Sequence, residues 1–594
     1  MLLVLAPFLG CGEREKKAPD AARYAARYAA RYAGSATYQV THYDYTFDLT
    51  TREATSTVSL RLVTAGDCIS IGYRPDEKKN VRFFDKDARE VVIANDILTA
   101  CDGDSLGWAS GSEIELSVSL TVPAVTLVDA ARNSTDVGYS VKKDREGRDF
   151  SYLFSWFGGC DRFGPCDPSP GYFATYRFTI HHPAGTTVLC PGVVVSATGT
   201  NKTTCELTEP APTYSAFSFM AGSSWKRIDL GTAGNIKLVL YDMPDSGLTA
   251  ILGENKIGEV FAGFLRWMEE NVGPFPFGHE LRYVVAPIAW GAFEHPTNIV
   301  VMETMPASLA ARGVSGARQA TVIRRILTHE TAHHWAGNLL TLRGIHDYVW
   351  KEAMAEYLTY LYEEARYGAA SAAEFPANWK AMSQHAQFYP VPRDMPALIA
   401  YAGHVYGSGP MIFFRQLEVR FGRDKVFAAV KGLLKNRGVA SVDDIKTALA
   451  TSIGENLDHY FETWVYGTGK PAWPIATATV APAGGGAKRV EVALSTADRV
   501  KRGCKFSVLL TGAKRPANQL VAGPFDFGFL GEKAPALVTA NPPFVVTGSS
   551  IDSRHECLAF APPPPPPQST PQSQSPPRSQ STPQRQSQSQ DQER

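Results

Sequence analysis

The sequence predicts a multidomain α+β protein, because three stretches of the chain follow different apolar patterns. Between about residues 37 and 225, segments such as STVSLRLVT and SEIELSVSLTV alternate apolar and polar residues between turn signals, as half-buried strands do. Between about 226 and 471 the pattern becomes mainly helical after a strand-rich beginning. Short alternating runs, including RVEVALS and KFSVLLTG, return from 472 to 560. We therefore expect an N-terminal β-sandwich-like domain, a central α+β domain and a small C-terminal β domain.

The two ends of the chain are expected to lie outside these domains. Residues 1–11 are mostly apolar and reach a Leu-Gly-Cys sequence at Cys11, which resembles the end of a secretion signal with a lipoprotein-type cleavage site. Residues 12–36 contain the repeat AARYAARYAARY, which we interpret as a linker, although its arginines could also form a helical face on a membrane. Residues 561–594, rich in Pro, Gln and Ser, are expected to be a disordered tail. We expect a bacterial lipoprotein, exported to the periplasm or cell surface and anchored in the membrane through Cys11; the alternative is a cytoplasmic chain with an apolar start.

The cysteines favour an exported protein. If Cys11 carries a lipid, eight cysteines remain, and an even number in the β-rich regions suits disulfides in an oxidising compartment. Connectivity cannot be deduced from a sequence, so we take sequential pairing as a hypothesis. The pairs would be Cys68–Cys101, Cys160–Cys166, Cys190–Cys205 and Cys504–Cys557.

Length and charge limit the partners. A chain of 594 residues with 44% hydrophobic content is long enough for three or four domains. Lysine plus arginine equal aspartate plus glutamate at 59 each, so we expect no nucleic-acid partner. No apolar run reaches the roughly 18 residues of a transmembrane helix. The oligomeric state stays open.

The stretch ILTHETAHHW, residues 326–335, carries the strongest chemical signal. His329 and His333 are four residues apart, and side chains at this spacing lie on one face of a helix. Two such imidazoles can ligate one Zn²⁺, and Glu330 between them can polarise a water on the metal. Apolar residues at helical spacing precede the motif and predict a helix with one buried face, and Gly337 is expected to end that helix. The alternative is a solvated helix that carries two histidines by chance.

A catalytic zinc ion needs a third protein ligand. Glu352 lies near the start of a second helical pattern, KEAMAEYLTYLYEEARYG, nineteen residues after His333. This spacing lets the first helix end, a loop reverse, and the second helix present a carboxylate from its first turn. A surface glutamate is the ordinary alternative, but the metal would then lack a ligand. We predict one Zn²⁺ per chain, held by His329, His333 and Glu352.

These motifs resemble those of a known family. HETAHHW followed by KEAMAEY resembles the HExxHxW…NEGxAEY signature of the aminopeptidase N family of zinc metallopeptidases, which includes leukotriene hydrolase. GAFEH at 291–295 resembles its GxMEN exopeptidase motif, and YAGHVYGSGPMIFF resembles the segment of its catalytic tyrosine. RFGPCDPSPGY resembles a stretch of its N-terminal β domain, and ENLDHYFETWVYGTGKP the end of its catalytic domain. The resemblance implies a thermolysin-like catalytic domain over 226–471, with the strand LRYVVAPI at the edge of its cleft.

The chemistry of such a site gives each residue a role. Zn²⁺ would act as a Lewis acid and lower the pKa of a bound water. Glu330 would take the proton of that water and pass it to the leaving amine. The resemblance makes Tyr406 the donor to the developing oxyanion; the alternative is a partly buried aromatic beside a Gly-rich turn. Glu356, one turn after Glu352, would orient a ligand histidine, unless it is a surface glutamate.

The GAFEH motif bears on specificity. In the family, the glutamate of GxMEN binds the free α-amino group of the substrate, which restricts cleavage to the first residue. The matching residue is Glu294, with Gly291 and Ala292 as neighbouring substrate-binding residues. Phe293 and His295 replace the methionine and asparagine. The family also supplies a second amine contact, a Gln or Glu, where the segment FSWFGGCDRF here has neither.

We therefore predict an exported zinc metallopeptidase that acts on peptides, as an aminopeptidase in the first place. The missing amine contact keeps a second interpretation open, a zinc endopeptidase or a peptidase with altered recognition of the N-terminus. A non-catalytic binding scaffold is the third, and the presence of all the ligands argues against it.

Overall fold

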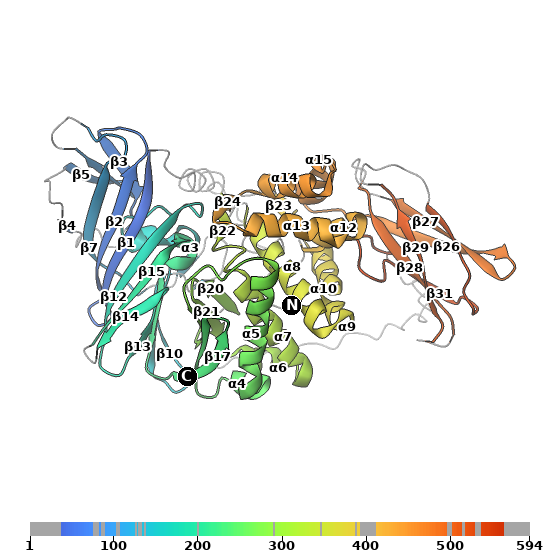
Figure 1. Ribbon diagram of the computed structural model, residues 1–594, viewed down its shortest axis with the longest axis horizontal. Helices are drawn as coiled ribbons and strands as arrows, with labels where there is room; N and C mark the ends of the chain where they lie inside the picture. The colour runs from blue at the N-terminus through green and yellow to red at the C-terminus, as the bar shows by residue number, and fades with distance from the viewer. Residues whose placement is uncertain are drawn as a thin grey trace, which may run out of the picture.

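The computed structural model describes residues 37–562 except for short gaps. The gaps are 75–81, 85–89, 103–106, 125–126, 129–133, 136–137, 199–200, 289–290, 345–346, 387–388, 393–410, 496–501, 514–516 and 529–535. Cys11, the AARY repeat, Tyr406 and the tail from 563 lie outside the described residues, so the expectations for them stay predictions. Three regions follow one another along the long axis of the molecule (Figure 1).

Two facing β-sheets form the N-terminal region. One is seven-stranded, in the order β14 (Val193–Thr198), β15 (Lys202–Pro212), β12 (Phe173–His181), β1 (Tyr38–Asp48), β2 (Glu53–Leu62), β7 (Glu113–Thr121) and β4 (Arg82–Phe84). The other has the order β10 (Gly138–Lys143), β11 (Asp149–Phe154), β16 (Ser218–Gly222) and β13 (Thr187–Leu189).

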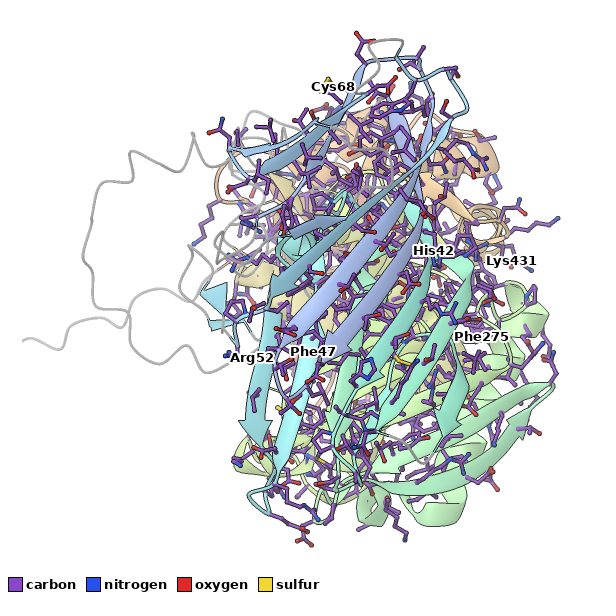
Figure 2. The ribbon with its side chains drawn as sticks, turned by 90° about the vertical axis from the view of Figure 1, so that its left-hand side faces the viewer. His42, Phe47, Arg52, Cys68, Phe275 and Lys431 are labelled. Atoms are coloured by element: carbon purple, nitrogen blue, oxygen red, sulfur yellow. A yellow bond between two sulfur atoms is a disulfide. The ribbon has the colours of Figure 1, made fainter. Side chains whose placement is uncertain are left out.

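Aromatic side chains fill the space between these sheets. The ring of Phe47 on β1 lies 4.8 Å from that of Tyr139 on β10 and 5.2 Å from that of Phe219 on β16. Figure 2 looks onto the seven-stranded sheet, with Phe47 on β1 and Arg52 in the turn after it. Burial alternates along β7, as the alternating sequence predicts. The two sheets thus form the expected β-sandwich.

Shorter elements complete this region. They are the sheet β3 (Cys68–Gly72), β6 (Ile97–Cys101) and β5 (Glu90–Ala94), the pair β8 (Leu127–Val128) and β9 (Ser134–Thr135), and the short helices α2 (Trp156–Gly159), η2 (Cys160–Arg162) and α3 (Thr213–Ala216).

The central region is a five-stranded sheet with helices. The sheet order is β17 (Lys226–Ala233), β18 (Ile236–Asp242), β19 (Glu280–Ala286), β21 (Asn298–Met302) and β20 (Ala292–His295). β18, β19 and β21 are parallel, and the two edge strands, β17 and β20, each run antiparallel to their neighbour. The sequence LRYVVAPI supplies β19, a buried strand inside the sheet, and its expected place at the edge of the cleft stays a prediction. β20 forms one edge of the sheet because the GAFEH segment folds back as a hairpin on β21.

Two long helices of this region carry the zinc signature, α7 (Gly316–Ala332) and α8 (Tyr348–Tyr367). They are joined by a buried ion pair in which Nη2 of Arg325 lies 3.1 Å from Oε1 of Glu363. The other helices are α4 (Leu248–Leu252), α5 (Glu254–Asn271), α6 (Met305–Ala311), α9 (Ala369–Ala372), α10 (Glu374–Gln384), α12 (Ile412–Phe421), α13 (Arg423–Leu434), α14 (Val442–Ile453), α15 (Asp458–Tyr460) and η5 (Phe461–Val465). Short parallel pairs join β22 (Leu340–Leu342) to β24 (Gly438–Ala440) and β23 (Val391–Pro392) to β25 (Tyr466–Gly467).

Two three-stranded sheets form the C-terminal region. Their orders are β26 (Ile475–Gly484), β27 (Ala487–Ser495), β30 (Ala536–Ala540), and β29 (Gln519–Asp526), β28 (Lys505–Thr511), β31 (Gly548–Ile551). The multidomain α+β class expected from the sequence is confirmed. β16 ends at Gly222 and β17 begins at Lys226, on either side of the boundary expected at 225; the boundaries themselves stay predictions.

The four disulfides pair as the sequential hypothesis predicts. They are Cys68–Cys101, Cys160–Cys166, Cys190–Cys205 and Cys504–Cys557. Among the described residues, no helix is both long and apolar enough to cross a membrane.

Candidate metal centre

Helix α7 and the turn that follows it position the two histidines. His329 and Glu330 lie in the last turn of α7, and His333 is its C-cap with helical dihedrals, φ −62° and ψ −18°. The amide of His333 still donates to the carbonyl of His329, at 3.3 Å. The helix thus ends before His333 and not at the expected stop, Gly337. The continued helical dihedrals keep both rings on one face nevertheless.

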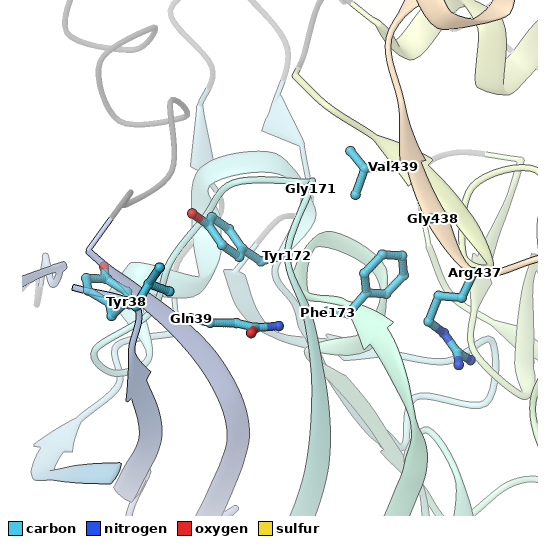
Figure 3. A pocket seen from close by; sticks show the side chains of 9 residues that line it. Tyr38, Gln39, Gly171, Tyr172, Phe173, Arg437, Gly438 and Val439 are labelled. Carbon is cyan, nitrogen blue, oxygen red and sulfur yellow. The ribbon is translucent and has the colours of Figure 1, made fainter. Parts of the chain in front are cut away.

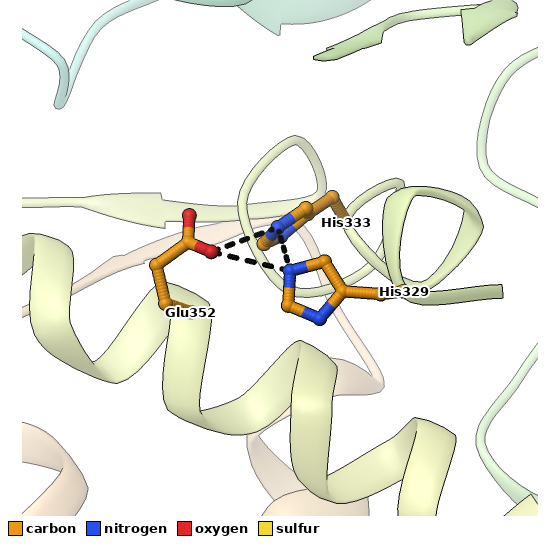
Figure 4. Close-up of side chains that lie close together, drawn as sticks. All are labelled: His329, His333 and Glu352. Carbon is orange, nitrogen blue, oxygen red and sulfur yellow. Dashed lines mark hydrogen bonds and ion pairs between the residues drawn. The ribbon is translucent and has the colours of Figure 1, made fainter. Parts of the chain in front are cut away.

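Three donor atoms from α7, its cap and α8 converge on one point (Figure 4). Nε2 of His333 lies 3.0 Å from Nε2 of His329. Oε2 of Glu352 lies 3.2 Å from Nε2 of His329 and 3.5 Å from that of His333. Bonds of about 2.0 Å at tetrahedral angles would separate the donors of a zinc ion by about 3.3 Å. The triangle therefore fits one zinc ion, and its chemistry, two imidazoles and a carboxylate, is that of a catalytic zinc site.

Partners behind the histidines fix which nitrogen faces the point of convergence. Nδ1 of His329 lies 3.0 Å from Oε2 of Glu356, and Nδ1 of His333 lies 2.9 Å from the carbonyl oxygen of Ala336. Each Nδ1–H donates to an oxygen, which leaves the Nε2 lone pair for a metal. Glu356 is fully buried and also accepts from the indole of Trp379 at 3.2 Å. Its alternative as a surface glutamate is therefore wrong.

The electrostatics of the centre favour positive charge at His329, whereas burial and Lys351 lower the pKa of His333. Burial lowers the pKa of His329, but hydrogen bonds to Glu352 and Glu356 outweigh it and raise this pKa to about 10. Burial also raises the pKa of the Glu330 carboxyl to about 8. A group with a pKa near neutrality is suited to accept and return a proton. The centre can thus hold a cation and provide a proton acceptor beside it.

The edge strand β20 brings Glu294 to the same place. Its carboxylate, that of Glu330 and a ring nitrogen of His333 offer atoms within 4.8 Å of one another. Gly291 and Ala292 begin the hairpin, where the carbonyl of Gly291 accepts from the amide of Met302 at 2.9 Å. The structure thus places Glu294 at the centre, with Gly291 and Ala292 along the edge beside it.

One residue of the centre was missed in the sequence. Nζ of Lys351 lies 2.8 Å from Oε1 of Glu294 and 2.8 Å from Oε1 of Glu352. Lys351 is the first residue of KEAMAEY, where the family signature has asparagine. This difference was the signal that the sequence offered. For Glu294, burial opposes the charge, but Lys351 brings the pKa of its carboxyl below the ordinary value.

A cavity of about 540 Å³ lies apart from this centre (Figure 3). It is lined by Tyr38, Gln39, Val63, Gly171, Tyr172, Phe173, Arg437, Gly438 and Val439. None of the predicted site residues lines it. It sits at the junction of the sandwich with β24, so we assign the chemistry to the convergent side chains and not to this cavity.

Comparison with known proteins agrees with the geometry. The Peptidase family M1 domain matches residues 259–464. Aminopeptidase N of Streptomyces lividans is 24% identical over 342 residues, which cover 53% of this chain and 38% of that protein. Puromycin-sensitive aminopeptidase of Caenorhabditis elegans is 24% identical over 202 residues, or 33% and 21% of the two chains. The matches thus span well under half the length of either relative.

Solved structures show the same fold. An M1 zinc metallopeptidase mutant from Deinococcus radiodurans, bound to a Tyr-Ser-Ala substrate, has a TM-score of 0.58 at 16% identity, covering 74% of this chain and 96% of that one. Legionella pneumophila aminopeptidase A in complex with aspartic acid has a TM-score of 0.64 at 14% identity, covering 90% and 60%. Residues 259–464 thus match a Peptidase family M1 domain, and the signature on α7 and α8 together with this fold supports a place for the chain among the aminopeptidase N family of zinc metallopeptidases.

Proposed function

We propose that this chain is a zinc-dependent peptidase that hydrolyses peptide bonds at or near the N-terminus of its substrates. The observation that carries the proposal is the convergence of His329, His333 and Glu352 with Glu330 beside them. A zinc ion held there would supply Lewis acidity for the peptide carbonyl and for the attacking water.

The chain's own residues divide the remaining work. Glu330 takes the proton of the attacking water and returns it to the departing amine, which needs a carboxyl that titrates near neutral pH. Glu356 and the carbonyl of Ala336 hold the two imidazoles in one tautomer. Tyr406, outside the described residues, is the proposed hydroxyl donor to the oxyanion.

Replacing Glu330 tests the proposal. Glu330→Gln keeps the shape of the site but cannot accept a proton, so kcat should fall by about 10²- to 10⁴-fold on peptide substrates. Metal analysis should still find one zinc ion per chain. Glu270→Gln, on the exposed side of α5, is the control and should keep wild-type kcat. Full activity of Glu330→Gln would refute the mechanism, and a wild type that binds zinc without cleaving any peptide would favour a binding scaffold.

A specific observation favours altered recognition of the N-terminus as the second candidate. Glu294, which would hold the substrate's α-amino group, is paired with Lys351. The rates on a free-amine peptide and its N-acetylated form separate the two candidates. A strong preference for the free amine identifies an aminopeptidase, and comparable rates identify altered recognition.

We also propose that the protein is exported and anchored through Cys11. The four disulfides support an oxidising compartment, because cytosolic proteins rarely keep structural disulfides. Free thiols at these eight cysteines, in protein isolated from its own cells, would contradict export.

A further inference from the structure

A buried lysine stands between two important carboxylates of the site. The side chain of Lys351 is 1% exposed, and its Nζ lies 2.8 Å from Oε1 of both Glu294 and Glu352. A buried ammonium is tolerated where carboxylates replace its lost hydration, as these two do. Lys351 is therefore held inside the site by two ion pairs.

The pair with Glu294 bears on the amino end of the substrate. The family resemblance gives this carboxylate the task of receiving an α-ammonium. Here the ammonium of Lys351 already lies at ion-pair distance from it. A second ammonium at Glu294 would lie beside a like charge in a buried place where screening is weak. A charged amino end therefore gains little from Glu294.

Aromatic rings form a wall beside this ion pair. Nζ of Lys351 lies 5.0 Å from the ring centroid of Tyr348. The ring of Trp156 lies 5.8 Å from that of Tyr348 and 4.9 Å from that of Phe293. Trp156 belongs to the segment where the family has its second amine contact. Phe293 is buried and backs the ring of Trp156. The partly exposed rings of Trp156 and Tyr348 make the apolar surface of this wall, which suits an uncharged group.

The backbone conformation of Trp156 indicates that the surrounding structure holds its ring in place. Its φ of 44° lies in the left-handed region, which a bulky side chain seldom adopts. Such a conformation persists only where the surrounding structure holds it, and it is often found at ligand sites. The ring contacts with Phe293 and Tyr348 are part of that surrounding structure.

We propose that Lys351 takes the place of the substrate's α-ammonium at Glu294, so that the site accepts peptides whose N-terminal nitrogen is acylated and uncharged. The acyl group lies against the rings of Trp156 and Tyr348, and its carbonyl oxygen accepts a hydrogen bond from Nζ of Lys351. This inference rests on the proposed peptidase function and names the substrate class, N-acylated peptides.

Binding provides a test that does not depend on turnover. Calorimetry of zinc-loaded Glu330→Gln with Ala-Ala-Ala and with its Nα-acetyl form gives the ratio of the two Kd values. We expect the acetylated peptide to bind at least as tightly as the free one. Adding Lys351→Asn should shift the ratio toward the free amine by about tenfold or more, because Glu294 is then uncompensated.

Two further variants control for folding and for general effects. Lys351→Met keeps most of the side-chain volume without the charge and should shift the Kd ratio in the same direction as Lys351→Asn. Lys425 donates to the carbonyl of Ile453 on α14, away from the site, and Lys425→Asn should leave the ratio unchanged. Free peptide bound about tenfold more tightly before any change of Lys351, or a ratio that neither Lys351 variant shifts, would overturn the proposal.

Turnover separates this proposal from the proposed function. Wild-type kcat/KM for leucyl-aminomethylcoumarin and for its Nα-acetyl form should lie within about threefold of each other, and Lys351→Asn should favour the free amine by about tenfold. A much faster wild-type reaction with the free amine contradicts the proposal. If neither compound nor any peptide is cleaved, the peptidase function fails, while the Kd ratio still decides the role of Lys351.

Discussion

At the level of single residues, four buried or nearly buried carboxylates and one lysine determine the charge of the metal centre. Glu294, Glu330, Glu352 and Glu356 surround the histidines, and Lys351 is the cation paired with two of them. The same oxygen-rich surroundings that raise the pKa of His329 would stabilise a divalent cation. Lys351 opposes that cation, because its ammonium lies 2.8 Å from the carboxylate of a proposed ligand.

Removing the charge of Lys351 should therefore strengthen zinc binding. In Lys351→Met, Glu352 no longer shares its charge with an ammonium and the repulsion between two neighbouring cations is gone. We expect the Kd for zinc, measured by competition with a chelator, to fall by about tenfold or more. Lys351→Arg keeps the positive charge and should stay near the wild-type Kd. Zinc binding that weakens or stays constant in Lys351→Met would show that the lysine does not oppose the metal.

At the scale of elements, His295 ties β20 to the N-terminal sandwich. Its Nε2 lies 2.7 Å from the hydroxyl of Tyr152 on β11, and its Nδ1 lies 2.5 Å from the carbonyl oxygen of Ser215 on α3. The carbonyl requires a proton on Nδ1, so Nε2 of the neutral ring accepts from the tyrosine. The strand that carries Glu294 is thus anchored through the neighbouring residue.

This contact predicts a pH-dependent stability. Burial lowers the pKa of His295 to about 4, below the ordinary value of 6.5, so the unfolded chain takes up a proton that the folded protein excludes. The neutral His295 therefore contributes to the free energy of unfolding in full above pH 6.5, and this contribution is lost as the pH falls through 4. The pKa shift corresponds to roughly 3 kcal/mol of that free energy. In His295→Asn, Tm should be lower at pH 7.5 but should fall less between pH 6.5 and 4.5 than in the wild type. His279→Asn, at an exposed site, should keep the wild-type slope; a parallel slope for His295→Asn would contradict the prediction.

The elements also show what the sequence could and could not predict. The helical periodicity and the HExxH spacing are local, so the placement of His329 and Glu330 on α7 followed from them. Alternation likewise located the sandwich strands. The bond between Tyr152 and His295 joins residues 143 positions apart, and no local pattern reports it. The departure of Lys351 from the family signature could be read in the sequence, but its pairing with Glu294 could not, because only the folded sheet edge brings Glu294 to it.

For the whole molecule, the site depends on how the sandwich meets the central region. The hydroxyl of Tyr214 donates to the carbonyl of Gly337 at 2.9 Å, just after the zinc signature. Arg282, buried on β19, donates to the carbonyl of Cys190 at 3.3 Å. Cys190 forms a disulfide with Cys205 on β15. This disulfide links β15 of the sandwich to the segment that Arg282 of the central region contacts. The sandwich thus contributes to the position of the metal centre and is not a separate appendage.

The disulfides should stabilise the molecule unequally, in the order of the loops that they close. Cys504–Cys557 spans 53 residues and Cys160–Cys166 spans 6, so loop-closure entropy assigns about 4 and about 2 kcal/mol to them. Replacing Cys504 and Cys557 by serine should therefore lower Tm in calorimetry more than replacing Cys160 and Cys166. Reduction with a thiol reagent should lower Tm of the wild type below that of either double variant. A molecule whose Tm is indifferent to reduction would not need an oxidising compartment, and the structural support for export would then be lost.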